Sequence, residues 1–228
     1  MTASQPDLKI VADPAAAVAV VLADQAARGG SIVLTGGSSV AEAYQRAAAL
    51  EPDWGKVTLW WGDERCVPPE DDRSNFRLAK EALLDRIEAP PAEVHRIRGE
   101  LPPDEAAREL DEALAGVQLD LLLLGLGPDG HMASLFAGSP QLAVRDRRAT
   151  SGPAGLEPFV DRVTMTLPTI QSASQIVFIV AGEDKADAVA AAFGAEPSDK
   201  TPASLARMAP GEIKVFLDGP AASKLDER

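Results

Sequence analysis

Residues 119–139 read LDLLLLGLGPDGHMASLFAGS, passing from an apolar run through a glycine-rich turn to an acid and an imidazole. An apolar run without polar alternation is typical of a strand that is buried on both faces of a parallel sheet. Asp129 and His131 follow the carboxyl end of this run. Because ligands of open α/β sheets bind beyond the carboxyl ends of the strands, we expect these two titratable groups to belong to a functional site.

An earlier segment repeats the arrangement of an apolar strand followed by a polar turn. Residues 32–34 are apolar. The turn that follows them consists of Gly36, Gly37, Ser38 and Ser39. The glycines permit tight turning, and the serines are expected to cap a helix that continues through residues 41–50. Backbone N–H groups at such a helix start can bind phosphate, although the same turn can simply connect a strand to a helix.

A third segment of this kind begins at residues 57–61, an apolar run that ends in GDERCVPPEDDRSNF. We expect these fifteen letters to form a polar loop, with Ser74 capping a helix that continues to residue 87. The loop contains Asp63, Arg65 and Asn75. Charged and polar groups therefore stand again where a strand ends, at the edge that also receives Asp129 and His131.

The remainder of the chain alternates strands with helices. Further strands are expected at 8–12, 94–97, 163–166, 175–181 and 213–217, and further helices at 14–29, 103–115, 132–136, 182–193 and 202–208. This alternation predicts an α/β fold with a mostly parallel sheet covered by helices on both faces. With 228 residues, the chain is expected to form a single domain over 1–228.

Composition limits the partners that the chain can take. A formal net charge of −13 argues against nucleic acid or an anionic membrane, because both require a basic surface. A small anionic substrate remains compatible if arginines and lysines cluster locally. The single cysteine, Cys66, excludes an intrachain disulfide, and the sequence contains neither an apolar run of membrane-spanning length nor a secretory signal pattern. We expect a cytoplasmic protein that is a monomer or a weak dimer.

Four segments carry a resemblance to a known family. They are LTGGSSV, GDERCVPPEDDRSNFRLAKEALL, LGLGPDGHMASLFAGS, and RVTMTLP with GEDKADAV. In these segments the chain resembles the 6-phosphogluconolactonases, which share a Rossmann-like fold with glucosamine-6-phosphate deaminase and ribose-5-phosphate isomerase. The resemblance implies hydrolysis of 6-phospho-D-glucono-1,5-lactone to 6-phosphogluconate in the oxidative pentose phosphate pathway, with no metal and no organic cofactor.

Lactone hydrolysis requires an activated water, stabilisation of an oxyanion and protonation of the leaving ring oxygen. His131 can serve as the base that activates water and can return the proton to the leaving oxygen. Asp129 can orient that imidazole, or it can cap the turn. Arg65 can stabilise the oxyanion, bind the phosphate, or form a structural ion pair.

The phosphate of such a substrate is expected on the turn of residues 36–39, where backbone N–H groups and the two serine hydroxyls can surround it. The resemblance places Lys185 and Arg162 at basic positions of the family motifs, where they can add positive charge. Asn75 and Arg73 are expected to shape the loop over the pocket.

Other interpretations remain open at this point. A deaminase or an aldose–ketose isomerase would use Asp63 as the proton-transfer base. In the deaminase family, however, a glutamate stands five positions after the histidine of the DGH turn, and this chain has Phe136 there. A non-catalytic sugar-phosphate sensor could use the same pocket. Cys66 could act as a nucleophile with His131 as its base, whereas His95 is expected to be structural.

Overall fold

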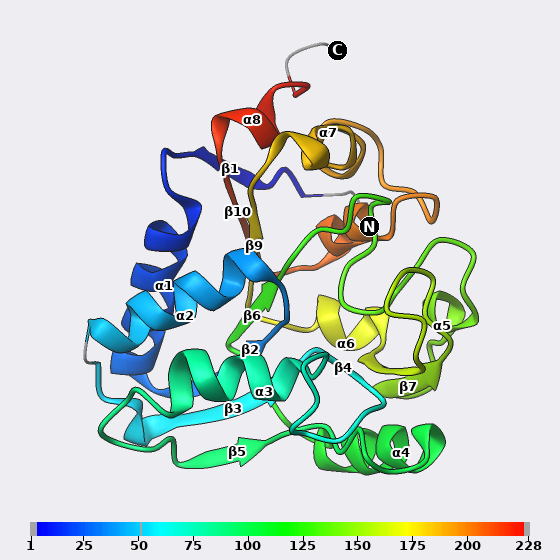
Figure 1. Ribbon diagram of the computed structural model, residues 1–228. Coiled ribbons are helices and arrows are strands. Elements are labelled where there is room, and N and C mark those ends of the chain that lie inside the picture. Colours follow the sequence, from blue (N-terminus) through cyan, green and yellow to red (C-terminus); the bar gives the residue numbers. More distant parts are fainter. Residues whose placement is uncertain (1–3, 51, 226–228) are drawn as a thin grey trace.

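The computed structural model describes residues 4–50 and 52–225, and Figure 1 shows them as a central sheet surrounded by helices. The sheet has seven strands, and each neighbouring pair is parallel. In spatial order they are β1 (Asp7–Ile10), β10 (Glu212–Leu217), β9 (Gln175–Val180), β6 (Leu121–Leu124), β2 (Gly30–Leu34), β3 (Val57–Trp61) and β5 (Glu93–His95). The prediction of an α/β fold with a mostly parallel sheet is confirmed.

The strand order changes direction once, between β2 and β6. From β2 the chain adds β3 and β5 on one side, and it then returns to place β6 on the other side of β2, followed by β9 and β10. Ile32 of β2 is paired with Leu121 of β6. The connections that leave these two strands therefore diverge and open a crevice at the carboxyl edge of the sheet.

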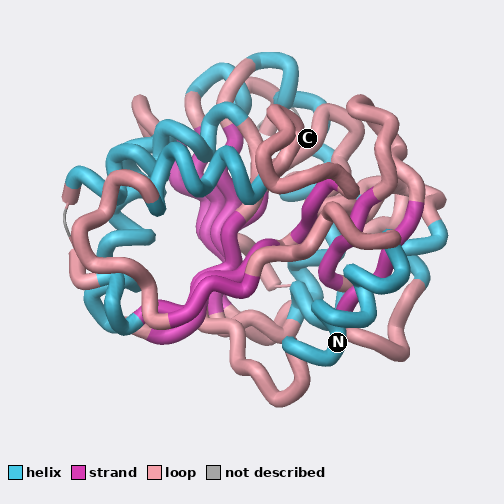
Figure 2. The backbone as a smooth tube through the Cα atoms, turned by 60° about the horizontal axis from the view of Figure 1, so that its bottom comes forward, coloured by secondary structure: helices cyan, strands magenta, loops and turns pink. Residues whose placement is uncertain are grey.

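Helices lie on both sides of the sheet, as Figure 2 shows. The helices α1 (Pro14–Arg28) and α2 (Ser38–Ala49) pack against each other and contact β9. The other described helices are α3 (Asn75–Ala79), α4 (Pro103–Ala113), α5 (Pro140–Ala143), α6 (Leu167–Gln171), α7 (Ala186–Phe193) and α8 (Gly219–Ala222). Short 3-10 segments cover Trp54–Lys56, Glu183–Lys185 and Pro202–Met208, and a π-helical turn at Lys80–Leu84 continues α3.

The core lies along the central strands, which the helices cover on both faces. All four leucines of β6 are fully buried, as the unbroken apolar run predicts. The predicted start of α1 is also confirmed, because the Asp13 side chain accepts a hydrogen bond from the Ala16 N–H at 3.0 Å and Pro14 follows it. Gly29 ends this helix with φ of 82°.

A second, three-stranded antiparallel sheet corrects the expectation of a polar loop after β3. In order, its strands are β4 (Asp63–Arg65), β8 (Arg162–Met165) and β7 (Ala149–Gly152). Three residues reading Asp-Glu-Arg lack the apolar pattern of a strand, and β4 exists because it pairs with β8, about a hundred residues later. The pairing fixes the orientation of charged residues that would otherwise lie on a loop.

Two local expectations are wrong. Residues 132–136 form a turn with a bridge between Met132 and Leu135 instead of a helix, because Ala133 takes a left-handed backbone conformation with φ of 47°. At α2 the helix begins at Ser38 itself, after Gly37, and within the described residues no side chain caps it. The serine hydroxyls are thus not used in capping.

Within the described ranges, no helix has both the length and the apolar character needed to cross a bilayer.

Candidate active site

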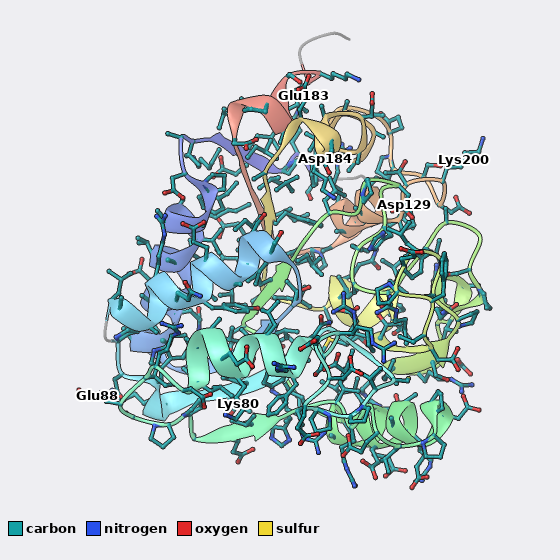
Figure 3. All side chains as sticks on the ribbon, viewed as in Figure 1. Lys80, Glu88, Asp129, Glu183, Asp184 and Lys200 are labelled. Carbon is teal, nitrogen blue, oxygen red and sulfur yellow. The ribbon has the colours of Figure 1, made fainter. Side chains whose placement is uncertain are left out.

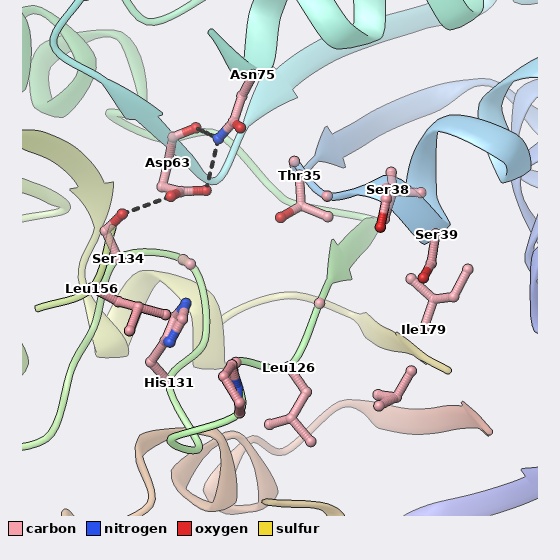
Figure 4. Close-up of a pocket in the computed structure, with 18 of the residues that line it drawn as sticks. Thr35, Ser38, Ser39, Asp63, Asn75, Leu126, His131, Ser134, Leu156 and Ile179 are labelled. Carbon is pink, nitrogen blue, oxygen red and sulfur yellow. Dashed lines mark hydrogen bonds between the residues drawn. The ribbon is translucent and has the colours of Figure 1, made fainter. Parts of the chain in front are cut away.

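A pocket of about 290 Å³ opens at the carboxyl edge of the sheet, where the connections after β2 and β6 diverge. It is also lined by β4, by the end of β9 and by residues 156–157. The pocket is lined by ten of the residues that the sequence analysis proposes as site residues: Gly36, Gly37, Ser38, Ser39, Asp63, Arg65, Asn75, His131, Arg162 and Lys185. In the close-up of Figure 4, His131 and the two serines lie on opposite sides of the pocket.

Asp129 lies beside the pocket and holds the imidazole of His131. The protonated Nδ1 of His131 donates to Asp129 Oδ1 at 2.5 Å, and the His131 backbone N–H donates to the same oxygen at 3.2 Å. Asp129 therefore both orients the ring and stabilises the turn, two roles that the sequence presents as alternatives. The hydrogen bond from the imidazole lowers the pKa of Asp129 below its usual range. Figure 3 shows Asp129 on the connection that follows β6.

The other ring nitrogen of His131 is open to the pocket. Among the described residues, none forms a hydrogen bond with Nε2. Gly127 allows the ring to lie close to the backbone, because a Cβ at that position would stand 2.0 Å from Nδ1. A neutral imidazole held at Nδ1 by a carboxylate, with Nε2 free, can accept a proton from a bound water.

A second wall is a chain of hydrogen bonds around the buried carboxylate of Asp63, drawn as dashed lines in Figure 4. Ser134 Oγ donates to Asp63 Oδ2 at 2.6 Å, and Asn75 Nδ2 donates to the backbone oxygen of Asp63 at 2.9 Å and to Oδ1 at 3.2 Å. Arg65 Nη1 donates to Asn75 Oδ1 at 2.5 Å and to the Arg73 carbonyl at 2.7 Å. Asp63, Asn75 and Arg65 are thus mutually fixed.

Glu64 is a buried anchor that the sequence does not single out. Its carboxylate accepts hydrogen bonds from the backbone N–H groups of Arg65, Asn75 and Phe76 at 2.7–2.8 Å, and from Ser74 Oγ at 2.9 Å. Burial raises the pKa of Glu64, whereas these donors favour the carboxylate. The side chain ties the start of α3 to β4, and it therefore places Asn75 and Arg65 at the pocket.

Two arginines meet on one side of the pocket because Arg65 and Arg162 are directly opposite in the β4–β8 pairing. Arg162 is buried; its Nη2 donates to the Pro158 carbonyl at 2.8 Å, while Nε has no partner among the described residues. Burial, followed by the charge of Arg65, lowers the pKa of Arg162. Two like charges and an unused donor at one pocket wall are suited to an anion.

The turn after β2 and the side chain of Lys185 add further donors to the same pocket. Ser38 and Ser39 begin the twelve-residue helix α2, and within the described chain their hydroxyls form no hydrogen bond. Lys185 is mostly buried, and its Nζ lies 3.6 Å from Asp184. The helix start, the hydroxyls and the ammonium are all groups that bind phosphate.

Cys66, Arg73 and His95 lie outside this pocket. Burial raises the pKa of the Cys66 thiol to about 11, which disfavours a thiolate at neutral pH. Arg73 forms an ion pair with Asp71 at 2.7 Å. The His95 ring stacks on Trp60 with centroids 4.0 Å apart, as a structural residue would.

Residues 4–50 and 52–225 contain no group of three or more histidine, cysteine, aspartate or glutamate side chains arranged to hold a metal ion.

Sequence comparison places residues 7–215 in one match to a family described as glucosamine-6-phosphate isomerases and 6-phosphogluconolactonase. A 6-phosphogluconolactonase of Mycobacterium tuberculosis is 37% identical over 237 residues, which cover 96% of this chain and 95% of that protein.

Solved structures agree with this match. The 6-phosphogluconolactonase from Trypanosoma cruzi superposes with a TM-score of 0.83 at 26% identity, covering 99% of this chain and 98% of its own. A monomeric glucosamine-6-phosphate deaminase superposes with a TM-score of 0.85 at 19% identity, covering 96% and 99% of the two chains, so that it shares the fold.

Proposed function

The chain belongs to the family of glucosamine-6-phosphate isomerases and 6-phosphogluconolactonases, and we propose that it hydrolyses 6-phospho-D-glucono-1,5-lactone to 6-phosphogluconate. The observation that carries the proposal is the imidazole of His131, held at Nδ1 by Asp129 with Nε2 open to a pocket rich in anion-binding groups. The reaction is a step of the oxidative pentose phosphate pathway.

In the proposed reaction, His131 Nε2 takes a proton from water while the water oxygen attacks the lactone carbonyl carbon. The bond from this carbon to the ring oxygen then breaks, and the ring oxygen takes the proton from the imidazolium. General base and acid transfer of this kind contributes about 10²- to 10⁴-fold to a rate. The Asp129 carboxylate stabilises the imidazolium that forms between the two proton transfers.

The phosphate is placed on the turn of residues 36–39, with Lys185 and Arg162 supplying positive charge. Support comes from the unused hydroxyls of Ser38 and Ser39 and from the unpartnered Nε of Arg162 among the described residues. Because the serines and His131 lie on opposite sides of the pocket, a phosphate on this turn leaves the far end of the substrate at the imidazole (Figure 4).

Arg65 is placed at the developing oxyanion. Its guanidinium lines the pocket and is fixed by Asn75 Oδ1 and the Arg73 carbonyl. A donor that is already oriented stabilises the charge of the tetrahedral intermediate without reorganising during the reaction. Because Arg65 lies opposite Arg162 in the strand pairing, it could also contact the phosphate, which is the second role considered for it.

The deaminase interpretation is disfavoured by two features of the pocket. Phe136 provides an apolar ring where that chemistry needs a carboxylate, and Asp63 already accepts hydrogen bonds from Ser134 and Asn75. A base held by two donors is poorly placed to take a proton from a sugar carbon.

A lactone assay coupled to detection of 6-phosphogluconate tests the proposal, with glucosamine 6-phosphate as the competing substrate. We expect hydrolysis well above the spontaneous rate and no release of ammonia. Ammonia release at a rate matching lactone hydrolysis would establish the deaminase instead, and the absence of catalysis with bound 6-phosphogluconate would establish a sensor.

The phosphate site is tested by Lys185→Ala, with Lys200→Ala as the matched control, since Lys200 is exposed and does not line the pocket. We expect Lys185→Ala to raise KM about 10-fold or more, with a smaller change in kcat, because it removes a charge that binds substrate and transition state alike. An unchanged KM would place the phosphate elsewhere.

A further inference from the structure

We propose that Phe136 is a positioning residue for His131, and that Gly155 completes the arrangement by allowing residues 153–158 to lie against the Phe136 ring. The inference rests on the proposed lactone hydrolysis and adds a requirement to it. The DGH turn alone does not hold the imidazole; a buried aromatic ring and a later segment of the chain complete its support.

The first observation is the contact between the two rings. The centroids of His131 and Phe136 lie 4.5 Å apart with an interplanar angle of 40°, and both side chains line the pocket. The hydrogen bond to Asp129 and the close approach of Gly127 both hold the imidazole at its Nδ1 side. A bulky ring within contact distance supports the imidazole from a further direction and keeps Nε2 directed at the substrate.

The second observation is the place of Phe136 in the packing of the molecule. The side chain is only 5% exposed, yet it does not belong to the continuous hydrophobic core that joins the sheet to its helices. Its ring instead contacts both the imidazole and the segment around Gly155. A buried phenylalanine outside the core, against a titratable group, is better explained by the site than by the stability of the sheet.

The third observation is the steric requirement at position 155. A Cβ added to Gly155 would stand 2.6 Å from Cγ of Phe136 and 2.8 Å from its Cδ1. No real Cβ tolerates such distances, so the backbone of Gly155 touches the ring directly. The next two residues, Leu156 and Glu157, line the pocket, which makes the segment a continuation of the site wall.

Successive contacts therefore join the segment around Gly155, the phenyl ring and the imidazole, an arrangement that we call the stack. Pressure on the phenyl ring from the Gly155 side is transmitted to His131, because close-packed side chains have no space in which to absorb it.

The test compares Phe136→Leu, Phe136→Ala, Gly155→Ala and the double variant Phe136→Ala with Gly155→Ala. We expect Phe136→Leu to lower kcat about 10-fold with KM changed less than about twofold, because it misorients the base without touching the phosphate site. Gly155→Ala is expected to lower kcat by a similar factor of about 10, since its methyl group displaces the phenyl ring.

The double variant distinguishes positioning from loss of packing. If Gly155 acts through the ring, adding Gly155→Ala to Phe136→Ala causes no further loss of kcat, because the methyl group then occupies vacated space. Phe159→Leu is the control, since Phe159 is 71% exposed near the same segment and should leave kcat unchanged. Multiplicative losses in the double variant, or a normal kcat in Phe136→Leu, would overturn the proposal.

A spectroscopic measurement keeps the inference separable from the proposed reaction. The chain has two histidines, so the ring-proton NMR signals of His131 are assigned by comparison with His95→Ala. We expect one sharp set of His131 signals in the wild type and broadened or doubled signals in Phe136→Leu, with His95 unaffected. Should the wild type lack lactonase activity, this result still supports the stack, and unchanged His131 signals overturn it.

Discussion

The two walls of the pocket are built in different ways. The wall that carries His131 is mainly local, because Asp129 and the glycines that shape its turn come from the residues next to it, and the contact through Phe136 adds the segment around Gly155. The second wall is assembled from distant parts of the chain: Ser134 reaches Asp63 across a separation of 71 residues, and β4 exists only through its pairing with β8. The reacting group is therefore specified by a short motif, and its surroundings by the tertiary fold.

Asp129→Asn removes the carboxylate that holds His131 at Nδ1, and it should lower kcat more than any change in the second wall. The amide cannot stabilise the imidazolium, so we expect kcat to fall about 10- to 100-fold with KM nearly unchanged. Steady-state lactone hydrolysis measures this, with exposed Asp146→Asn as the control. A kcat within twofold of the wild type would show that the hydrogen bond at Nδ1 is not needed.

The hydrogen-bonded pair of Asp129 and His131 also predicts how the activity depends on pH. Because the pKa of Asp129 is depressed from its ordinary value near 3.8, its stabilising contribution is present above that value and is lost as the pH falls through the lower folded value. Activity lost between pH 7 and pH 5 would therefore not come from this carboxyl. A pH profile of kcat/KM for the wild type and for Asp129→Asn measures this, and a loss of activity above pH 5 that occurs in the wild type but not in the variant would contradict it.

Glu64→Gln changes the buried carboxylate that ties the start of α3 to β4 in the second wall. The amide nitrogen leaves two buried donors without an acceptor, which we expect to cost about 3 kcal/mol in the free energy of unfolding, at about 1–3 kcal/mol each. Urea denaturation measures the loss, and exposed Glu88→Gln should cost nothing measurable. If Glu64→Gln is as stable as the wild type, the carboxylate does not anchor α3.

The two walls also differ in how far the sequence could predict them. The apolar run of β6 and the acid and histidine after it predict a buried strand with a site at its end, because the contacts that form them are local. The contact between Phe136 and Gly155 is not local, and the sequence does not indicate it. No periodicity identifies β4 or the buried role of Glu64, since both depend on partners that folding brings together. Ser134 could not be assigned either, because the helix expected over 132–136 is a turn that directs its hydroxyl to Asp63.

Ser134→Ala removes one hydrogen bond from the buried Asp63 carboxylate and leaves the hydrogen bond between Asp129 and His131 in place, so it tests the second wall separately. We expect a loss of about 1–2 kcal/mol in unfolding free energy and a smaller effect on kcat than that of Asp129→Asn. Thermal or urea unfolding compared with exposed Ser223→Ala provides the measurement. A loss of kcat equal to that of Asp129→Asn would mean that both walls take part equally in the chemistry.

Cys66→Ala should have the smallest effect, because the thiol lies outside the pocket and its pKa is raised to about 11. We expect unchanged kcat and KM, and slow alkylation of the wild-type thiol at pH 8 that accelerates as the pH approaches 11. Loss of hydrolysis in this variant would restore the cysteine nucleophile as the mechanism.

The most direct test of His131 as the base is chemical complementation of His131→Ala. We expect kcat to fall by about 10²- to 10⁴-fold and to be partly restored by added imidazole in proportion to its concentration, because a small base can enter the vacated space. His95→Ala, the matched control, should retain full activity without imidazole. Near-normal kcat in His131→Ala would contradict the assignment of water activation to this residue.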